Sequence, residues 1–209
     1  MISNYVLSKL WTEIKTHSIS KNASGPPQPF YIGEQWNGGI MFVGICPGDR
    51  ITNESETLKN LNDLHWTTDI TFNTGNKVYK EVLKRVSAGK FINDIVGEDW
   101  SNICYTNLVK NPMKNNMSIS QEDIDSWKPI LLRQIKFFKP STIIAFGKIV
   151  GKELLDTNTV VNNVYDFNGI KVIQVFHYAY MMKVGIYQSQ IERIKTVIKT
   201  TKPGLMKYV

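Results

Sequence analysis

The stretch Gly39-Ile40-Met41-Phe42-Val43-Gly44-Ile45 runs directly into Cys46-Pro47-Gly48-Asp49-Arg50. The first part is a short apolar run, which is typical of a strand buried on both faces of a sheet. The second part contains Pro and Gly, which favour a turn. Three later apolar runs have the same character, at residues 103–109, 142–146 and 172–176. The sequence therefore predicts four buried strands.

Segments with helical spacing separate these strands. Apolar residues recur every three or four positions between Val78 and Val86. Ser120 and Asp123 resemble a capping box, and the helix that follows is expected to end at Phe138. Further helices are expected at 1–20, 148–155 and 188–200. This alternation predicts an α/β fold, with three α/β/α layers and a central four-stranded, mainly parallel sheet.

Composition limits the class of protein. The chain has 209 residues, of which 42% are hydrophobic and 21% charged. Such a chain suits a single domain over 1–209, with an N-terminal helix and loop at 1–38 and a core at 39–200. No apolar run approaches the roughly 20 residues that a membrane span needs. Residues 1–15 mix apolar and charged side chains, unlike a signal peptide. We expect a cytoplasmic monomer without membrane contact, associated with the nucleoid in a prokaryote.

Charge and cysteine content narrow the choice of partners. The net charge of +7 favours a polyanionic partner such as DNA, because each phosphate contact releases counterions. Cys46 and Cys104 are the two cysteines of the chain. Two are too few for a disulfide framework or a four-cysteine metal site, so both are expected to be reduced. A nucleotide-binding fold is disfavoured because the sequence has no G-x-G-x-x-G or Walker-type loop.

Parallel sheets bind ligands at the carboxyl ends of their strands. Four polar segments that contain Gly, Pro or His follow the predicted strands, at 46–50, 107–116, 147–148 and 177–183. These segments are the candidate site.

Three of these segments resemble, in the same order, motifs of the uracil-DNA glycosylase superfamily. Gly44-Ile45-Cys46-Pro47-Gly48 is placed like the water-activating G-x-x-P-G turn of that family. The stretch from Tyr105-Thr106-Asn107-Leu108-Val109-Lys110 through Ile144-Ala145-Phe146-Gly147 is similar to the corresponding stretch of the family 4 enzymes. His177 has the position of the H-P-S motif. The resemblance covers residues 39–200 and implies a glycosylase that flips a base out of DNA and hydrolyses its glycosidic bond.

The resemblance also implies roles for individual residues. Asn107 would read the edge of the flipped base, since a carboxamide both donates and accepts. Phe72 would stack on the base and Ile45 would line its pocket. His177 would stabilise the base as it leaves as an anion. No metal or cofactor is implied for the reaction.

Contacts to DNA are expected from two kinds of group. Phosphates would be bound by the turn formed by Pro47 and Gly48 and by Lys110, Lys148 and Lys183. The segment 177–183 would insert into the minor groove with an apolar tip. Its contact residues would be Tyr178, Tyr180 and Met181.

The sequence departs from the family at two places. Relatives hold an acid or Asn where this chain has Ile45 and Cys46, so Asp49 or backbone carbonyls of the turn would position water, with Cys46 as a weaker aid. The family 4 enzymes hold an iron–sulfur cluster with four cysteines. Asn111 and Trp127 occupy two of these positions and the N-terminal pair is absent, so no cluster is expected.

A structural role remains open for each of these residues. The alternative role of His177 is to cap its strand, and that of Asn107 and Asp49 is to form turns. Cys46 and Phe72 are alternatively core residues. For any single lysine, a solvated surface position is the more common role. At the level of the whole protein, the alternative to an active glycosylase is a non-catalytic module that binds DNA or a base.

Overall fold

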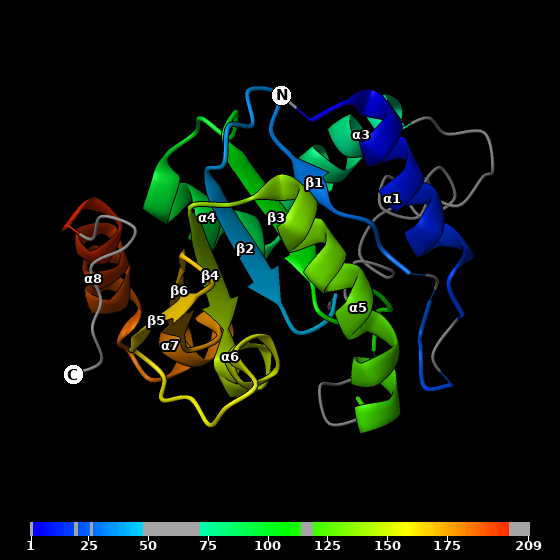
Figure 1. The fold of residues 1–209 in the computed structure, drawn as a ribbon. Helices are drawn as coiled ribbons and strands as arrows, with labels where there is room; N and C mark the ends of the chain where they lie inside the picture. The colour runs from blue at the N-terminus through cyan, green and yellow to red at the C-terminus, as the bar shows by residue number, and fades with distance from the viewer. Residues whose placement is uncertain (1, 19–20, 26, 48–71, 114–118, 201–209) are drawn as a thin grey trace.

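The computed structural model describes residues 2–18, 21–25, 27–47, 72–113 and 119–200. Within these ranges, six strands form one sheet in the order β1-β3-β2-β4-β6-β5 (Figure 1). The strands are β1 (Tyr31–Ile32), β2 (Ile40–Gly44), β3 (Ile103–Asn107), β4 (Thr142–Phe146), β5 (Val164–Phe167) and β6 (Ile170–Val175). The four predicted strands are its parallel centre.

The expectation of only four strands is wrong, because an antiparallel strand is added at each edge of the sheet. The β1 strand has two residues, which is too short to give a sequence pattern. The β5 strand has no fully buried residue and contains the exposed Asp166, so it lacks the apolar run of a central strand. Edge strands contact fewer neighbours, and their sequences are therefore less constrained than those of central strands.

Seven helices lie within the described residues. They are α1 (Asn4–Thr16), α3 (Phe72–Arg85), α4 (Ser87–Val96), α5 (Gln121–Phe138), α6 (Gly147–Leu155), α7 (Tyr178–Lys183) and α8 (Tyr187–Thr200). The sequence did not indicate α4 or α7. The predicted capping box at the start of α5 is confirmed, since the Asp123 amide donates to Ser120 Oγ and the Ser120 amide donates to Asp123 Oδ2.

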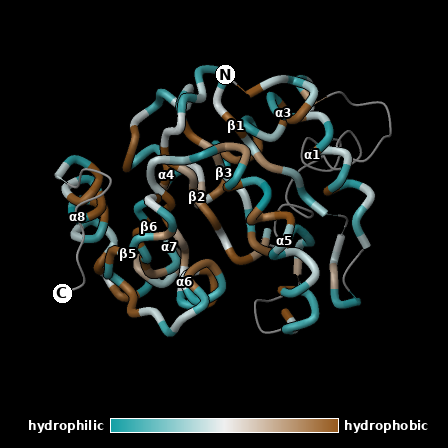
Figure 2. Tube along the Cα trace, viewed as in Figure 1, coloured by the Kyte–Doolittle hydropathy of each residue, from teal (hydrophilic) through white to brown (hydrophobic). Residues whose placement is uncertain are grey.

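Helices cover both faces of the sheet, which confirms the three-layer α/β/α class. Alternate strand residues belong to two core clusters: Met41 and Val43 lie in the first and Phe42 lies in the second. Residues of α1, α5 and α6 complete the first cluster, and residues of α4, α7 and α8 complete the second. Figure 2 shows hydrophobic residues concentrated on the central strands and on one side of several helices. None of the helices described is long and apolar enough to cross a membrane.

Candidate functional site

The parallel register brings three of the predicted segments to one edge of the sheet. Gly44 at the end of β2 pairs with Asn107 at the end of β3. The pairing continues beyond the strands, where the Leu108 amide donates to the Gly44 carbonyl oxygen at 2.8 Å. The central strands end on the side of the molecule where α6 and α7 lie (Figure 1). The candidate site is therefore built from the carboxyl ends of β2, β3 and β6.

Asn107 has an unusual hydrogen-bonding environment. Its side chain is 99% buried, since only 1% of the residue is exposed. The Tyr105 hydroxyl lies 3.4 Å from Asn107 Oδ1, to which it donates. Asn107 Nδ2 has no hydrogen-bond partner among the described residues. An unpaired buried donor costs free energy, so a ligand that brings an acceptor to Nδ2 recovers that cost.

Gly44 makes room for the Asn107 carboxamide. A Cβ at Gly44 would lie 2.3 Å from Asn107 Oδ1 and 3.4 Å from the Tyr105 hydroxyl. Only glycine therefore allows the carboxamide to lie against the end of β2. The same glycine opens the G-x-x-P-G motif, so the motif also has a steric role at the neighbouring strand.

Two tyrosines that the sequence interpretation assigned no role lie near this strand end: Tyr105, which contacts Asn107, and Tyr79, which contacts Tyr105. The rings of Tyr79 from α3 and Tyr105 are 6.5 Å apart between centroids. Burial raises the pKa of Tyr105 well above its usual value, and the nearby Tyr178, Tyr79 and Cys46 raise it further. These hydroxyls therefore stay protonated at neutral pH and act as hydrogen-bonding groups. Strand alternation was the signal for Tyr105, which lies two residues before Asn107 and so faces the same side.

His177 follows β6 and caps α7. Its Nδ1 accepts a hydrogen bond from the Ala179 amide at 3.3 Å. This acceptor role assigns the proton of the neutral ring to Nε2. Burial lowers the pKa of His177 below its usual value of 6.5, so the neutral ring prevails at pH 7. The ring lies against Tyr178, with 4.1 Å between centroids. His177 thus offers one N–H donor from a neutral imidazole.

Cys46 is partly buried in the turn after β2. Burial raises its pKa to about 11, and a hydrogen bond with the Met113 backbone acts in the opposite direction. The thiol is therefore protonated at neutral pH, which disfavours a role as a nucleophile or as a metal ligand. Burial also raises the pKa of Tyr178 to about 12, with a further contribution from Cys46. Gly48 and Asp49, which the sequence interpretation placed in the site, lie outside the described residues.

Phe72 and Ile45 are not placed as expected for residues that contact the base. Both belong to the first core cluster, whereas Tyr105 belongs to the second. Phe72 packs against Trp11, with 5.8 Å between ring centroids. The structure therefore does not bring the Phe72 ring beside Asn107, because the ring packs in the core cluster on the other face of the sheet. Stacking of Phe72 on a flipped base stays a prediction.

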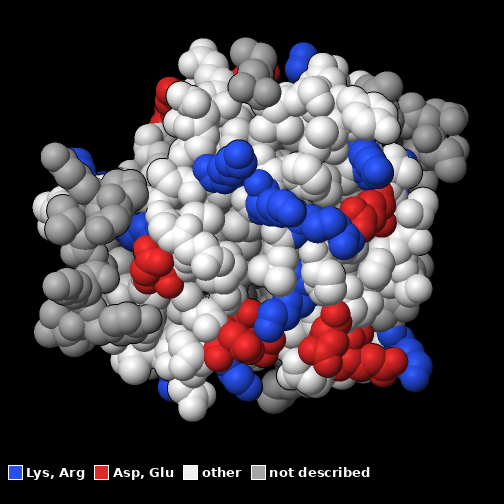
Figure 3. Space-filling view, in the orientation of Figure 1, with Lys and Arg blue, Asp and Glu red and all other residues white. Residues whose placement is uncertain are grey.

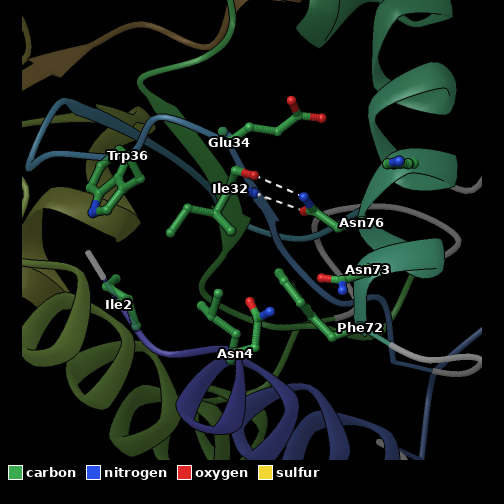
Figure 4. Close-up of a pocket in the computed structure, with 11 residues that line it drawn as sticks. Ile2, Asn4, Ile32, Glu34, Trp36, Phe72, Asn73 and Asn76 are labelled. Carbon is green, nitrogen blue, oxygen red and sulfur yellow. Dashed lines mark hydrogen bonds between the residues drawn. The ribbon is translucent and has the colours of Figure 1, made fainter.

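Phe72 instead lines a cavity of about 380 Å³ between α1, α3 and the segment after β1 (Figure 4). Asn76 lies on its wall and binds the backbone of Ile32 through both ends of its carboxamide, at 3.0 and 2.8 Å. None of the lining residues except Phe72 was predicted to be in the site. None of Asn107, Cys46 and His177 lines this cavity.

Two of the predicted DNA contacts are wrong because their side chains are buried. Lys110 and Met181 each have an exposed fraction of 0%. Pro47 is also buried, and Tyr178 packs inward against Phe146 at 5.7 Å between ring centroids. Helix formation over Tyr178–Lys183, which the sequence did not indicate, explains Met181, because a helix turns one of its faces to the core.

The exposed side of α7 still carries large apolar side chains. Tyr180 is 49% exposed, Met182 41% and Val184 44%. Lys148 and Lys183 are exposed as expected. Figure 3 shows a separate band of Lys and Arg side chains across the face over α5, where Arg133, Lys136 and Lys139 are exposed. The outer side of α7, with the exposed Tyr180 and Met182, is therefore the candidate surface for contact with DNA in place of the buried Met181.

The residues present do not fit an iron–sulfur cluster. The two cysteines of the whole sequence cannot supply four thiolates. Asn111 and Trp127 are both fully buried, and the Trp127 ring packs against His17 at 4.2 Å between centroids. No group of three or more His, Cys, Asp or Glu side chains suited to a metal ion occurs in the described part of the chain.

Comparison with known proteins identifies the family of this chain. The model of the uracil DNA glycosylase superfamily matches residues 30–197. A type-4 uracil-DNA glycosylase from Pyrobaculum aerophilum is 26% identical over 148 residues. That alignment covers 68% of this chain and 64% of the relative, so the chain spans a little under two thirds of the relative's length. Because the family match extends over most of the sequence and includes all three strand ends, the chain belongs to the uracil DNA glycosylase superfamily.

Proposed function

We propose that this protein is a DNA glycosylase that flips uracil, or another modified or damaged base, out of DNA and hydrolyses its N-glycosidic bond. The observation that carries the proposal is the unpaired Nδ2 of the buried Asn107. A base carbonyl oxygen is the acceptor that this donor lacks. The type-4 uracil-DNA glycosylase relative and the basic net charge of +7 support DNA as the substrate.

Asn107 would recognise the base by its pattern of acceptors. Since the Tyr105 hydroxyl donates to Oδ1, the carboxamide is oriented so that Nδ2 remains available to donate to a base carbonyl oxygen. The second lone pair of Oδ1 remains able to accept an N–H from the base. Uracil presents such a carbonyl and N–H side by side, whereas cytosine presents an amino group where the carbonyl stands. The orientation therefore favours uracil over cytosine.

His177 would stabilise the leaving base. Bond cleavage leaves negative charge on the base, and a fixed donor in a desolvated site stabilises that charge. The neutral ring with its proton on Nε2 supplies such a donor. Asp49 is the proposed group that positions the attacking water, because the Cys46 thiol is a poor hydrogen-bonding group. No step of this scheme requires a metal ion or cofactor.

Release of the free base from a panel of DNA substrates tests the proposal. The panel contains uracil, hypoxanthine, xanthine and phage-type modified cytosines, in duplex and single-stranded DNA, with alkali-sensitive abasic sites as the readout. Release of uracil or a deaminated base favours a role in repair, and release of a phage-type base favours a role in defence. Asn107→Ala and His177→Ala should each lower kcat by roughly 100- to 1000-fold, the loss typical of a donor to a developing oxyanion.

Matched controls come from the same chain. Asn76→Ala removes a buried carboxamide that binds the Ile32 backbone, and His17→Ala removes an imidazole that packs on Trp127. Both should keep the wild-type rate. Full activity in folded Asn107→Ala and His177→Ala would show that the assigned site is wrong.

A second function is favoured by Cys46 and Ile45, which stand where relatives hold a group that positions water. On this alternative the protein binds DNA or an extrahelical base without cleavage. The same panel separates the two functions: the alternative gives salt-dependent DNA binding with no base released from any substrate. Asp49→Asn adds a direct test, because it should abolish turnover in the active enzyme and leave binding unchanged.

A further inference from the structure

Lys110 is a buried lysine that the proposed reaction does not use. The sequence places it three residues after Asn107, where a surface contact to phosphate was expected. Its side chain instead turns back into the protein and is fully buried. Burying an ammonium group costs several kcal/mol unless it is well paired. The position therefore requires a structural or functional reason.

Three oxygens surround Lys110 Nζ. It donates to Thr106 Oγ1 at 2.6 Å, to Gln134 Oε1 at 2.8 Å and to the main-chain carbonyl oxygen of Asn107. An ammonium group has three N–H donors and a neutral amine has two, so in either form the three acceptors use every donor and none is left for a ligand. All three acceptors are neutral, which makes this network different from a salt bridge. Lys110 consequently acts only through the residues that it holds.

The network ties the end of β3 to α5. Gln134 comes from α5 and also accepts from the Thr106 hydroxyl at 3.2 Å. Thr106 and Asn107 are adjacent in β3, so their side chains leave opposite faces of the sheet. Lys110 thus fixes the Asn107 peptide from the α5 side, while the Asn107 carboxamide lies on the side of Tyr105.

We propose that Lys110 is a positioning residue that fixes the Asn107 peptide and so aims its carboxamide at the flipped base. This inference deepens the proposed function and rests on it. A misplacement of about 1 Å at a reacting group costs on the order of 100-fold in rate, so a strand end held by one buried amine affects recognition strongly. Burial lowers the pKa of Lys110 to about 7, with nearby Cys104 acting in the opposite direction, which reflects how strongly the site is desolvated.

Affinity for two DNA ligands tests the proposal without relying on turnover. One duplex carries 2′-fluoro-deoxyuridine, a uracil nucleotide that resists cleavage, and the other carries a tetrahydrofuran abasic site. Lys110→Met should weaken binding of the uracil duplex by roughly 10- to 100-fold, as expected for a displaced Asn107 carboxamide. Binding of the abasic duplex should stay within about two-fold, because Asn107 has no base to read there.

Lys171→Met is the matched control. Lys171 is 6% exposed, and its Nζ donates to the Val197 carbonyl oxygen at 3.2 Å, on the side of α8. This variant should bind both duplexes like the wild type. Gln134→Leu is the milder variant should Lys110→Met fail to fold, because it keeps the Lys110 amine and its contact with Asn107. It should weaken binding of the uracil duplex by about three- to ten-fold, again without affecting the abasic duplex.

Two results would overturn the role of Lys110. One is unchanged binding of the uracil duplex in the folded variants. The other is an equal loss for both duplexes, which indicates general loosening of the fold and not a displaced base reader. Failure of the proposed function gives a different result. If the wild-type protein binds the uracil duplex preferentially but releases no base from cleavable uracil-containing DNA, base hydrolysis is excluded and the role of Lys110 in base recognition is not.

Discussion

Gly44→Ala offers the most direct test of how the site is built. The added Cβ would lie 2.3 Å from Asn107 Oδ1, whereas ordinary van der Waals contacts of a Cβ begin at 3.4 Å. The substitution therefore forces a displacement of about 1 Å. Asn107 is 1% exposed, so its side chain moves within a packed environment and loses its bond with the Tyr105 hydroxyl. Ala itself fits the extended backbone of β2 without strain.

The size of the effect follows from this displacement. A shift of about 1 Å at a positioned group lowers the rate on the order of 100-fold. Overpacking of a buried site costs roughly 1–3 kcal/mol of stability, which leaves most domains folded. We expect kcat/KM for uracil release to fall about 100-fold in a protein whose melting temperature drops by only a few degrees.

The assay is single-turnover release of uracil from an oligonucleotide, together with thermal unfolding. Gly151→Ala is a control with a matched clash, because its Cβ would lie 2.4 Å from Oε1 of the buried Gln174 carboxamide. It should lose similar stability and keep its activity. Wild-type kcat/KM in Gly44→Ala would refute the assignment of Asn107 as the base reader.

Two further predictions concern His177 and α7. Because burial lowers the pKa of His177, its neutral ring prevails above that pKa, so kcat/KM should be constant above pH 7 and fall only as pH drops below 6.5. The free energy of unfolding should also decrease below pH 6.5, since the unfolded chain binds a proton there that the folded ring resists. A rate profile with its acidic midpoint above pH 6.5 would contradict the lowered pKa of His177. The histidine resonances in NMR measure that pKa directly. Met181→Ala should cost about 2–4 kcal/mol in urea unfolding, whereas the exposed Met182→Ala should stay within about 0.5 kcal/mol. Met182→Ala should instead slow base release from duplex DNA several-fold more than from single-stranded DNA, because a wedge is needed only in a duplex; equal slowing on both substrates would rule out the wedge.

The sequence alone determined the central part of the fold. Apolar runs at β2, β3, β4 and β6 are long enough, and the helical spacing between them regular enough, to indicate a parallel sheet with helices on both faces. The strand ends followed from the same pattern, because parallel strands finish at one edge. The segments that contain Asn107 and His177 were therefore indicated by the pattern, and the family resemblance singled out these two residues. Short edge strands and the helix at 178–183 lacked such patterns and were missed.

Only the tertiary structure decided which side each candidate residue faces and what surrounds it. The sequence predicts that Lys110 lies on the surface, because no residue near it in the sequence indicates burial. Its Nζ lies 2.8 Å from Oε1 of Gln134, which comes from the distant helix α5. The burial of Met181 was missed for the same reason, since burial depends on contacts with distant segments. Gly44 leaves room for the Asn107 carboxamide and the Tyr105 hydroxyl donates to its Oδ1. Asn107 Nδ2 is then a buried donor without a partner among the described residues. Sequence periodicity indicates where a strand ends. The burial of the side chains at that end, and the hydrogen bonds that they make, arise only when the helices pack on the sheet.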